Sequence, residues 1–476
     1  MTDREGIRAN AKYLREVRPI DPDEIYEYVD GSPHPAVVRQ VLREEAVDLG
    51  LVERDDGTFV PAPECVVEPG WAPTAFPERY AHAFEEFLVE REGIDWHRGE
   101  SGDRLRETIR RLKERYYRRQ SVAYDDRVAL GYGLYHLPDY YATVGYVLDT
   151  LAERGLVKTP LRVLDVGAGT GGPALGLHDF FPREALVDYH AVEPSAAADV
   201  LERLLGETGR NFHPTIHRTT IEALDLPGLV DDPGSGVSGG GFDLVVFSNV
   251  LSELDDPVAA VERSLDVLAP DGAVVALEPA DLNTATALRT VEREVVSRTG
   301  ATVYAPTLRL WPDAEPSDRG WSFDVRADLA VPSFQSRLDE AGDDPGAFTN
   351  PTVQFAYAVF RPDGTRRLAV RADPARHAKL ADADRHVTRR VDLLAVKLSH
   401  DLTDDDDTNP VFKIGDGSES TGVFAVLTRE TSLNEVLAGA PYGSVLSFEQ
   451  ALVLWNDDEG AYNLVVDDTT VVDFVG

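Results

Sequence analysis

A glycine-rich stretch follows a short apolar run in the middle of the chain. Residues 161–172 read LRVLDVGAGTGG, in which Gly167, Gly169 and Gly171 alternate with single residues. Glycines at this spacing let a backbone turn approach a ligand closely, and the helix expected next presents free N–H groups at its start. Asp165 places a carboxylate just before the turn. This combination predicts a small-molecule site at the end of a strand.

Two classes of cofactor are compatible with this spacing. Gly167, Gly169 and Gly172 satisfy the dinucleotide pattern, and Glu193 follows 21 residues later, where an acid that binds a ribose belongs. Asp165 favours the other class, because a carboxylate there would repel a pyrophosphate and attract a cationic amino-acid group. A nicotinamide or flavin enzyme stays open as the alternative.

The elements that must position these side chains form a regular β-α series. Strands are expected at 161–166, 187–194, 242–249 and 272–278, with helical sequence between them. Parallel strands joined by helices build an open sheet whose carboxyl ends carry the binding residues. We therefore expect an α/β fold.

The string LDVGAGTG at 164–171 and the series of strands resemble the S-adenosylmethionine-dependent methyltransferases. The resemblance implies a seven-stranded, Rossmann-like core of class I, with S-adenosylmethionine as cofactor. Glu193 would accept the ribose hydroxyls, Asp165 would lie near the ammonium group, and Glu222 is a candidate for the adenine edge. Ser248 and Asn249 should line the site between cofactor and acceptor. The candidate cofactor-binding residues are Asp165, Gly167, Ala168, Gly169, Thr170, Gly171, Glu193, Glu222, Ser248 and Asn249.

No side chain stands out as a general base, so the catalytic residue is left unknown. Asn249 continues as Val-Leu-Ser rather than with the Pro-Pro-aromatic pattern of base-amino methyltransferases. His136, His178 and His190 are interpreted as structural, because a lone histidine near a sheet is more often part of the packing. Placement of the acceptor in line with the sulfonium can supply much of the rate.

A series of longer strings surrounds this core. They are YGLYHLPDYYA (132–142), DLVVFSNVLSEL (243–254), LEPAD (277–281), YAP (304–306), RGWSFDVRADL (319–329) and FAYAVFR (355–361). In order and wording they resemble the mitochondrial and bacterial small-ribosomal-subunit methyltransferase-like family, assembly factors that bind small-subunit ribosomal RNA. The resemblance covers roughly residues 120–361, and it implies ribosomal RNA or the small ribosomal subunit as the partner.

One feature of that family is missing from this sequence. Its members commonly carry cysteines after the proline of the YAP-like stretch and after the tryptophan of the GW-like stretch, and these hold an iron–sulfur cluster. With Cys65 as the only cysteine, we expect no iron–sulfur cluster and predict no metal site. Either ordinary packing replaces the cluster or the family assignment is too narrow. The corresponding positions read Pro306-Thr307, Trp311-Pro312 and Trp321-Ser322.

Residues 1–62 are predicted to form a winged helix. Helices are expected at 8–18, from about residue 21 and at 35–49, and a hairpin is expected around Asp56 and Gly57. The third helix offers Arg39 and Arg43 to DNA, yet it also carries three acids. A protein-contact or architectural role therefore competes with DNA binding.

A basic segment at 104–119 reads RLRETIRRLKERYYRR, with eight basic and two acidic residues. Leu105, Ile109 and Leu112 give it one apolar stripe, so it should form a helix with a cationic face. Such a face can neutralise phosphates, and the two tyrosines can stack on bases. Pairing with acidic neighbours is the competing interpretation. The candidate RNA-binding residues are Arg110, Arg111, Arg115, Arg118 and Arg119.

The C-terminal part of the chain is predicted to form a β-barrel. A basic approach at 361–397 leads into strand-like stretches between 391 and 474, with a short helix at 433–437. This order resembles an OB-fold, a module that often binds single-stranded nucleic acid through aromatic side chains. Phe412, Phe424, Trp455 and Tyr462 are candidates for that role, although apolar residues that alternate in a barrel are more often core.

Composition sets the outer limits of the interpretation. The 476 residues carry a formal net charge of −37, with 47 Lys and Arg against 84 Asp and Glu. We interpret this acidity as adaptation to concentrated salt, which screens the self-repulsion. No apolar run suits a membrane span or a secretory signal, so a cytoplasmic protein without a membrane partner is expected. The expected domains are the winged helix at 1–62, a helical connector at 63–123, the methyltransferase-like part at 124–361, and a basic linker with the barrel at 362–476.

The leading hypothesis is an enzyme, an S-adenosylmethionine-dependent methyltransferase or methyltransferase-like factor that acts on or with small-subunit ribosomal RNA in ribosome assembly. One alternative is a catalytically inactive scaffold with the same fold in ribosome assembly. The other is a regulator that binds DNA through its winged helix. The acceptor atom and the oligomeric state are left open.

Overall fold

The structure is a computed structural model that describes residues 4–118, 120, 122–230, 240–312, 314, 321–403 and 408–476. Its contacts divide the chain into two compact units. Unit 1 comprises Met1–Ser248, Arg263–Val274 and Asp328–Thr352, and unit 2 comprises Asn249–Glu262, Val275–Ala327 and Val353–Gly476. The chain passes between the units repeatedly, and each unit is considered by itself.

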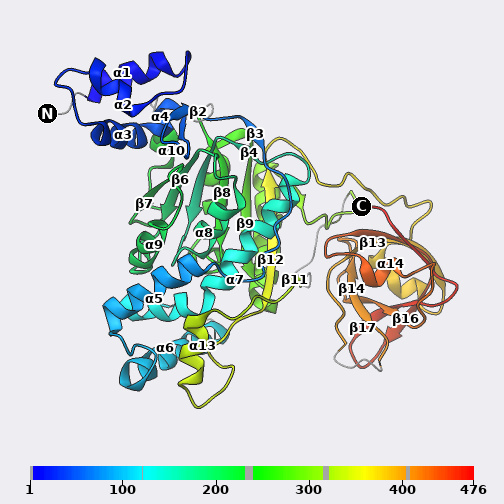
Figure 1. The fold of residues 1–476 in the computed structure, drawn as a ribbon. Coiled ribbons are helices and arrows are strands. Elements are labelled where there is room, and N and C mark those ends of the chain that lie inside the picture. The colour runs from blue at the N-terminus through cyan, green and yellow to red at the C-terminus, as the bar shows by residue number, and fades with distance from the viewer. Residues whose placement is uncertain are drawn as a thin grey trace. The chain divides into compact units, whose positions relative to one another are not determined.

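A parallel sheet forms the core of unit 1 (Figure 1). Its order is β9-β8-β5-β6-β7, and β5 pairs in parallel with both β6 and β8. Every residue of β5 and β6 is buried, as expected for parallel strands that are covered on both faces. The four predicted strands are confirmed, and β7 is added to them. The bounds are β5 (Leu161–Val166), β6 (Val187–Val192), β7 (Phe212–His217), β8 (Phe242–Ser248) and β9 (Leu268–Pro279), which continues into unit 2.

The helices of unit 1 pack on one another around the longest of them, α7. Asp125 caps α7 by accepting hydrogen bonds from Arg127 N–H (3.0 Å) and Val128 N–H (2.9 Å). Its buried face shares one hydrophobic cluster with residues of α5, α6 and α13. Within the described ranges, no helix has both the length and the apolar character that a membrane span requires. The bounds are α5 (Glu78–Glu92), α6 (Gly99–Tyr117), α7 (Asp126–Ala152), α8 (Gly172–Phe180), α9 (Ala197–Leu205), α10 (Leu226–Val230) and α13 (Ser333–Glu340), with the strand pair β3 (Cys65–Val66) and β4 (Lys158–Thr159).

The first sixty residues form helices followed by a hairpin, with bounds that differ from the prediction. The first helix lies four residues earlier than expected, and in this register Arg4 and Arg8 reach Glu45 (3.3 and 2.5 Å). The single helix expected at 35–49 breaks at Glu45, where φ is −101° and ψ is 5°. The bounds are α1 (Arg4–Leu14), α2 (Pro22–Ile25), η1 (Tyr26–Tyr28), α3 (Pro35–Glu44), α4 (Ala46–Leu49), β1 (Leu51–Glu53) and β2 (Phe59–Pro61).

The arginines predicted to meet DNA are held inside this N-terminal module. Arg43 of α3 makes two contacts with Glu53 of β1, Nε to Oε2 at 2.5 Å and Nη2 to Oε1 at 2.9 Å. Arg39 Nε lies 4.0 Å from the same carboxylate, whose side chain is 3% exposed. A two-pronged pair with a buried carboxylate occupies the guanidinium that a phosphate or base would need. The winged-helix assignment stays a prediction.

Unit 2 contains antiparallel strands next to its part of β9. The order there is β10-β12-β9, and both β10 and β11 pair antiparallel with β12. With β9 counted once, the strand path has the predicted seven members, and β11 is an additional short strand. The bounds are β10 (Thr302–Ala305), β11 (Asp324–Arg326) and β12 (Val353–Arg361), with α12 (Leu282–Thr299), η2 (Leu251–Glu253) and α11 (Pro257–Leu265), which spans both units.

Apolar packing occupies the stretches where the resembling family carries cysteines. Trp311 belongs to a hydrophobic cluster with Leu308 and Leu310, and its Nε1–H donates to Asp416 at 2.7 Å. The ring of Trp321 lies 5.4 Å from that of its neighbour Phe323. Among the described residues, no three His, Cys, Asp or Glu side chains are grouped as metal ligands.

The C-terminal part of unit 2 is a closed barrel of five strands (Figure 1). The order is β13-β14-β15-β17-β16, and β16 pairs again with β13, which closes the ring. Only β15 and β17 run parallel among these pairs, and β18 is added on β16. The predicted barrel is confirmed. The bounds are η3 (Leu380–His386), β13 (Arg390–Lys397), β14 (Val411–Gly415), β15 (Val423–Leu427), α14 (Val436–Gly439), β16 (Val445–Asn456), β17 (Ala461–Val466) and β18 (Val471–Phe474).

Candidate functional site

The loop between β5 and α8 is the glycine-rich turn at 167–171. Its start is tied to β6, because the N–H of Gly167 donates to the carbonyl of Val192 at 2.8 Å. Gly167, Gly169 and Gly171 have φ of 69°, 54° and 96°, a left-handed region that suits glycine. A Cβ on Gly171 would lie 2.9 Å from Leu201 Cδ1. The turn therefore needs glycine both for its shape and for its packing.

The carboxyl ends of three parallel strands meet beside this turn. Val166, the last residue of β5, pairs with Val192 of β6 and with Phe247 of β8. The strand order reverses direction at β5, and such a point leaves a crevice outside the strand ends. The structure thus brings four predicted elements of the site to one edge of the sheet. They are Asp165, the turn, Glu193 and Ser248.

Glu193 reaches back from the end of β6 to the turn. Its Oε2 accepts from Gly169 N–H and its Oε1 accepts from Ser195 N–H, both at 2.9 Å. The residue is 6% exposed. Each carboxylate oxygen keeps a second lone-pair direction, so the group can accept two further hydrogen bonds. A pair of adjacent hydroxyls is a ligand group that fits such acceptors.

Asp165 lies fully buried beneath the turn. Tyr189 donates its hydroxyl to Oδ2 at 2.6 Å, whereas Oδ1 has no hydrogen-bond partner among the described residues. Burial raises the pKa of this carboxyl to about 7, and the nearby Glu193 adds to the rise. A buried carboxylate oxygen without a partner favours a ligand that brings a positive charge or an N–H donor.

Four other predicted residues lie along the same chain segments. Ala168 and Thr170 are buried within the turn, and Ser248 is buried at the end of β8. Asn249 is the first residue of unit 2 and has a φ of 57°. Its N–H donates to the carbonyl of Leu277 at 2.8 Å, so the left-handed backbone there is held in place.

Glu222 lies on the loop that follows β7. Arg263 holds this loop by donating to the carbonyls of Ile221 (3.1 Å) and Leu224 (3.0 Å). The Glu222 side chain is exposed, and in the described part of the chain no hydrogen bond joins it to the turn or to Glu193. Its role at an adenine edge stays a prediction.

Sequence reasoning missed two tyrosines of α7 that pack on the turn. A Cβ on Gly169 would lie 3.8 Å from the ring of Tyr132, and one on Gly172 would lie 2.9 Å from Tyr140 Cβ. The rings of Tyr124 and Tyr132 meet edge-on at 5.4 Å. The available signal was the spacing of aromatic side chains at 132, 136 and 140, which places them on one helix face.

Glu278 is another residue that sequence reasoning missed, at the end of β9 in unit 2. It is 1% exposed, and Ser252 donates its hydroxyl to Oε2 at 3.0 Å. Burial raises the pKa of Glu278 to about 8, so this carboxyl holds a proton at neutral pH. The only signal was a charged residue at the end of an apolar strand.

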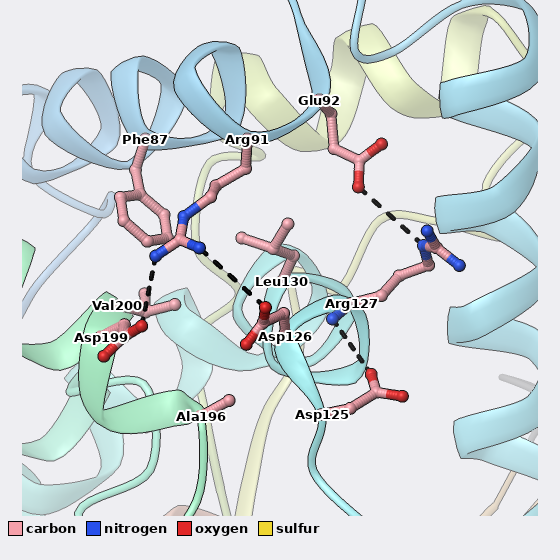
Figure 2. A pocket seen from close by; sticks show the side chains of 10 residues that line it. All are labelled: Phe87, Arg91, Glu92, Asp125, Asp126, Arg127, Leu130, Ala196, Asp199 and Val200. Atoms are coloured by element: carbon pink, nitrogen blue, oxygen red, sulfur yellow. Dashed lines mark hydrogen bonds and ion pairs between the residues drawn. The ribbon is translucent and has the colours of Figure 1, made fainter.

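A cavity of about 520 Å³ lies in unit 1 between the ends of α5, α7 and α9 (Figure 2). Figure 2 shows Arg91 between Asp199 (3.2 Å) and Asp126 (4.0 Å), with Arg127 on the other side, 3.9 Å from Glu92. Four acids against two arginines give the cavity a negative lining, which disfavours an anionic ligand. The lining residues are Phe87, Arg91, Glu92, Asp125, Asp126, Arg127, Leu130, Ala196, Asp199 and Val200.

The stretch that contains the turn, both acids and strands β5 to β9 matches a known family. The profile that matches residues 132–330 is described as a methyltransferase domain. This chain has a methyltransferase domain. The predicted enzyme class is confirmed, and S-adenosylmethionine is the cofactor of that class. On either side of the methyltransferase domain, residues 4–55 and 381–475 match the N-terminal and C-terminal domains of a family of unknown function, DUF8157.

The chain is also similar to individual proteins. It is 30% identical over 129 residues to Highly reducing polyketide synthase 40 of Fusarium pseudograminearum, a match that spans 26% of this chain and 5% of that protein. The plantazolicin methyltransferase BpumL is 12% identical, with a TM-score of 0.29, over 60% of this chain and 98% of that one. A SAM-dependent methyltransferase from Aquifex aeolicus is 15% identical, with a TM-score of 0.26, over 34% of this chain and 80% of that one. Likeness at this level says nothing about the acceptor.

The residues at this edge of the methyltransferase domain fit S-adenosylmethionine. The cofactor has an ammonium group, a ribose with two hydroxyls and a sulfonium. Asp165 offers a buried oxygen without a partner among the described residues, and Glu193 offers its remaining lone pairs. Gly169 leaves the space under Tyr132 free of a side chain.

The affinity of the methyltransferase domain for S-adenosylmethionine is expected to rise with pH as Asp165 ionises. Below about pH 7 the buried carboxyl is neutral, and above that value the carboxylate attracts the ammonium group. Between about pH 6 and pH 7.5 the ionised fraction grows up to roughly eightfold, and the Kd should fall by a similar factor. Calorimetry at the two pH values measures this change. Asp165→Asn cannot ionise, so an equal change in that variant would contradict the role of Asp165.

Proposed function

We propose that this chain transfers the methyl group of S-adenosylmethionine to an acceptor, and that the sheet edge around the turn holds the donor. Bound there, the cofactor supplies an electrophilic methyl group on its sulfonium. One observation carries the proposal: two buried acids flank the turn with acceptor capacity to spare. Asp165 keeps an oxygen without a partner among the described residues, and Glu193 keeps lone pairs beyond its two backbone bonds.

The side chains at this edge have separate tasks in the proposal. Glu193 holds the turn through Gly169 N–H and accepts the ribose hydroxyls. Asp165 balances the ammonium group. Tyr132 lies over Gly169 and keeps water away from the turn. Ser248, buried at the end of β8, borders the acceptor, and Asn249 follows it in a left-handed conformation of the kind that collects at functional sites.

Two measurements test this proposal. Isothermal titration calorimetry with S-adenosylhomocysteine measures donor binding. Incubation with tritiated S-adenosylmethionine and a cell extract, followed by separation of RNA, protein and small molecules, measures transfer. Binding together with label in one fraction supports the proposal, and no binding excludes it. Binding with no labelled fraction would favour the inactive scaffold.

A second proposal concerns the partner, RNA of the small ribosomal subunit, and the cationic face of α6 favours it. The side chains of Arg111 and Arg118 are 70% and 65% exposed. Each pairs with an acid one turn away on the same helix, Glu107 (2.7 Å) and Glu114 (2.6 Å) respectively. Exposed pairs of this kind are worth about 0.3–0.5 kcal/mol, so a phosphate can replace the carboxylate.

The other candidates on α6 differ in how far they are engaged. Arg110 pairs with Asp344 at 2.9 Å and lies over the ring of Phe348 at 5.0 Å, so part of its charge is already used. Tyr117 is 80% exposed and available for stacking. Arg119 lies outside the described residues. The favoured contact is therefore the face that carries Arg111 and Arg118.

Replacement of Arg110, Arg111 and Arg115 by glutamate is expected to weaken binding to small-subunit RNA by at least about tenfold in low salt. Each lost phosphate contact releases fewer counterions, so the slope of log K against log salt should also fall by roughly 2 to 3. Filter binding over a salt series measures both. Glu107→Gln with Glu114→Gln is the matched control, because it frees two arginines and should tighten binding. Unchanged binding in both variants would count against RNA contact by α6.

We further propose that the barrel is OB-like and supports this partner. The closed ring of five strands, with α14 between β15 and β16, agrees with that fold. Trp455 is 42% exposed and meets Tyr462 edge-on at 4.8 Å, which offers a stacking surface. Phe412, by contrast, is buried in the barrel core. A DNA-binding regulator is disfavoured, because Glu53 already holds Arg43.

A further inference from the structure

One histidine lies within a row of tyrosines on α7. The ring of His136 stacks on that of Tyr140, with 4.8 Å between centroids and 10° between planes. Tyr132 and Tyr135 flank it at 5.0 and 4.9 Å. The His136 side chain is 28% exposed. The imidazole is therefore fixed in orientation and still reachable by a small molecule.

One nitrogen of this ring is held by a carboxylate. Nδ1 of His136 lies 3.3 Å from Oδ2 of Asp139, and Asn350 donates its side-chain N–H to the same oxygen at 3.0 Å. Burial raises the pKa of Asp139, and the nearby His136 offsets part of that rise. A carboxylate at Nδ1 selects the tautomer with hydrogen on that nitrogen. Nε2 then keeps a lone pair, and among the described residues it has no hydrogen-bond partner.

The same helix face lies against the glycine-rich turn. Tyr132 and Tyr140, the two tyrosines four residues on either side of His136, pack on Gly169 and Gly172. The two tyrosines are hydrogen-bonded to each other. His136 therefore sits between the two side chains of α7 that contact the turn.

The two other histidines interpreted as structural are held more completely. His178 has Nδ1 2.7 Å from Asp179, and its Nε2 accepts from Gly209 N–H at 2.7 Å. In His190, Nδ1 lies 3.0 Å from His217, and Nε2 lies 3.2 Å from a carboxylate oxygen of Asp188. The structural interpretation agrees with these contacts, and His136 differs from both.

The tyrosines around His136 are poor proton acceptors. Burial raises the pKa of Tyr135 to about 12 and raises the pKa of Tyr140 well above its usual range. Both hydroxyls therefore stay neutral at physiological pH. Asp139 is the charged group that contacts the imidazole, and Lys113 of α6 lies over the Tyr135 ring at 3.9 Å.

We propose that His136 accepts the proton that the methyl acceptor loses, and that Asp139 is the positioning residue that holds its ring. This inference rests on the proposed methyl transfer. The acceptor oxygen or nitrogen forms its bond to the methyl carbon while the carbon–sulfur bond breaks. Sulfur leaves as the neutral thioether of S-adenosylhomocysteine, and the acceptor's proton passes to Nε2. The imidazolium that results is balanced by the Asp139 carboxylate.

The proposal assigns a class of acceptor. It is a hydroxyl or an N–H group, because an acceptor without a proton to lose, such as a thioether, would gain nothing from His136. The tyrosines on both sides of the imidazole favour a flat, unsaturated group that can lie against them. A nucleobase and a phenol both meet this description, and the labelled fraction distinguishes them.

Chemical modification tests the position of His136 without any acceptor. Diethyl pyrocarbonate attacks an imidazole nitrogen that carries a lone pair, and peptide mass spectrometry gives the rate at each histidine. S-adenosylhomocysteine should slow the modification of His136 by at least about fivefold, because bound ligands bury most of the pocket surface. His82, whose side chain is 82% exposed on α5, is the internal control and should react at an unchanged rate. Equal rates at His136 with and without S-adenosylhomocysteine would overturn the proposal.

Two variants test the proton transfer itself. His136→Gln should lower single-turnover methyl transfer to the labelled fraction by about 10²–10⁴-fold, while the Kd for S-adenosylhomocysteine stays within about twofold. Added imidazole should restore part of the rate to His136→Ala, a rescue that a purely structural role would not show. Asp139→Asn should give an intermediate loss, and His82→Gln should transfer at the wild-type rate.

The outcomes separate this inference from the proposed function. A wild-type chain that does not bind S-adenosylhomocysteine contradicts the donor site. A wild-type chain that binds and transfers, together with His136→Gln that transfers equally fast, contradicts only the role of His136. A wild-type chain that binds but labels no fraction overturns the transfer and the role of His136 with it.

Discussion

Glu193→Ala is expected to weaken binding of S-adenosylhomocysteine by about 100-fold or more, since hydrogen bonds to a charged group are worth about 1.5–3 kcal/mol each. The carboxylate fixes the turn through Gly169 N–H and the start of the next loop through Ser195 N–H. It is also the proposed acceptor for the two ribose hydroxyls. The variant therefore loses both the ligand contacts and the backbone geometry that prepares them. Isothermal titration calorimetry on the full chain measures the change.

Two further variants show whether the loss belongs to that carboxylate. Glu193→Gln keeps one acceptor oxygen and the size of the side chain, so it should bind with an affinity between those of the alanine variant and the wild type. Glu207→Ala removes an exposed acid just beyond α9 and should change the Kd by less than about twofold. Wild-type affinity in Glu193→Ala would exclude the proposed donor site.

Glu292→Ala is expected to lower the free energy of unfolding of unit 2 by about 3–5 kcal/mol, because it leaves a buried cation without its counter-ion. Glu292 and Arg289 of α12 are both fully buried and paired, and Arg309 contacts the same carboxylate. Arg289 also donates to the carbonyl of Tyr357 at 2.5 Å, so it cannot turn away towards water without breaking a second contact. Denaturant titration of the full chain, followed by circular dichroism, measures the midpoint.

A matched control exists on the same helix. Glu294 pairs with Arg298 at the surface, where its side chain is 45% exposed, and Glu294→Ala should cost less than about 0.5 kcal/mol. High salt should not restore the stability of Glu292→Ala, because buried charges are poorly screened. A midpoint equal to that of the control would show that the cluster contributes nothing to unit 2.

The local part of the donor site was within reach of the sequence. The glycine spacing fixed where β5 ends, and the strand has the predicted bounds, Leu161–Val166. Glu193 followed from the rule that parallel strands place their carboxyl ends at one edge, which the pairing of Val166 with Val192 bears out. These features depend on short stretches of chain, so periodicity and turn chemistry were enough to find them.

Features that depend on distant partners were not predictable in this way. Asp139 meets Asn350, 211 residues later, and only that contact shows that His136 belongs to a chain of hydrogen bonds. Arg110 meets Asp344, 234 residues later, so a segment that is strongly basic in composition is partly neutralised in the fold. The expected helix at 35–49 likewise breaks at Glu45, a residue that pairs with a different helix. Sequence patterns carry the local preference and contain no record of such contacts.

The closed ring of the C-terminal barrel imposes an order on its own synthesis. Val396 of β13 pairs with Val445 of β16, and Val423 of β15 pairs with Tyr462 of β17, so the first three strands cannot close the ring. A nascent chain that has exposed only β13, β14 and β15 carries a three-stranded sheet with two open edges, where neighbouring nascent copies can join. The barrel closes only after β17 has emerged, and a translational pause before residue 461 would lengthen the interval in which aggregation competes with folding.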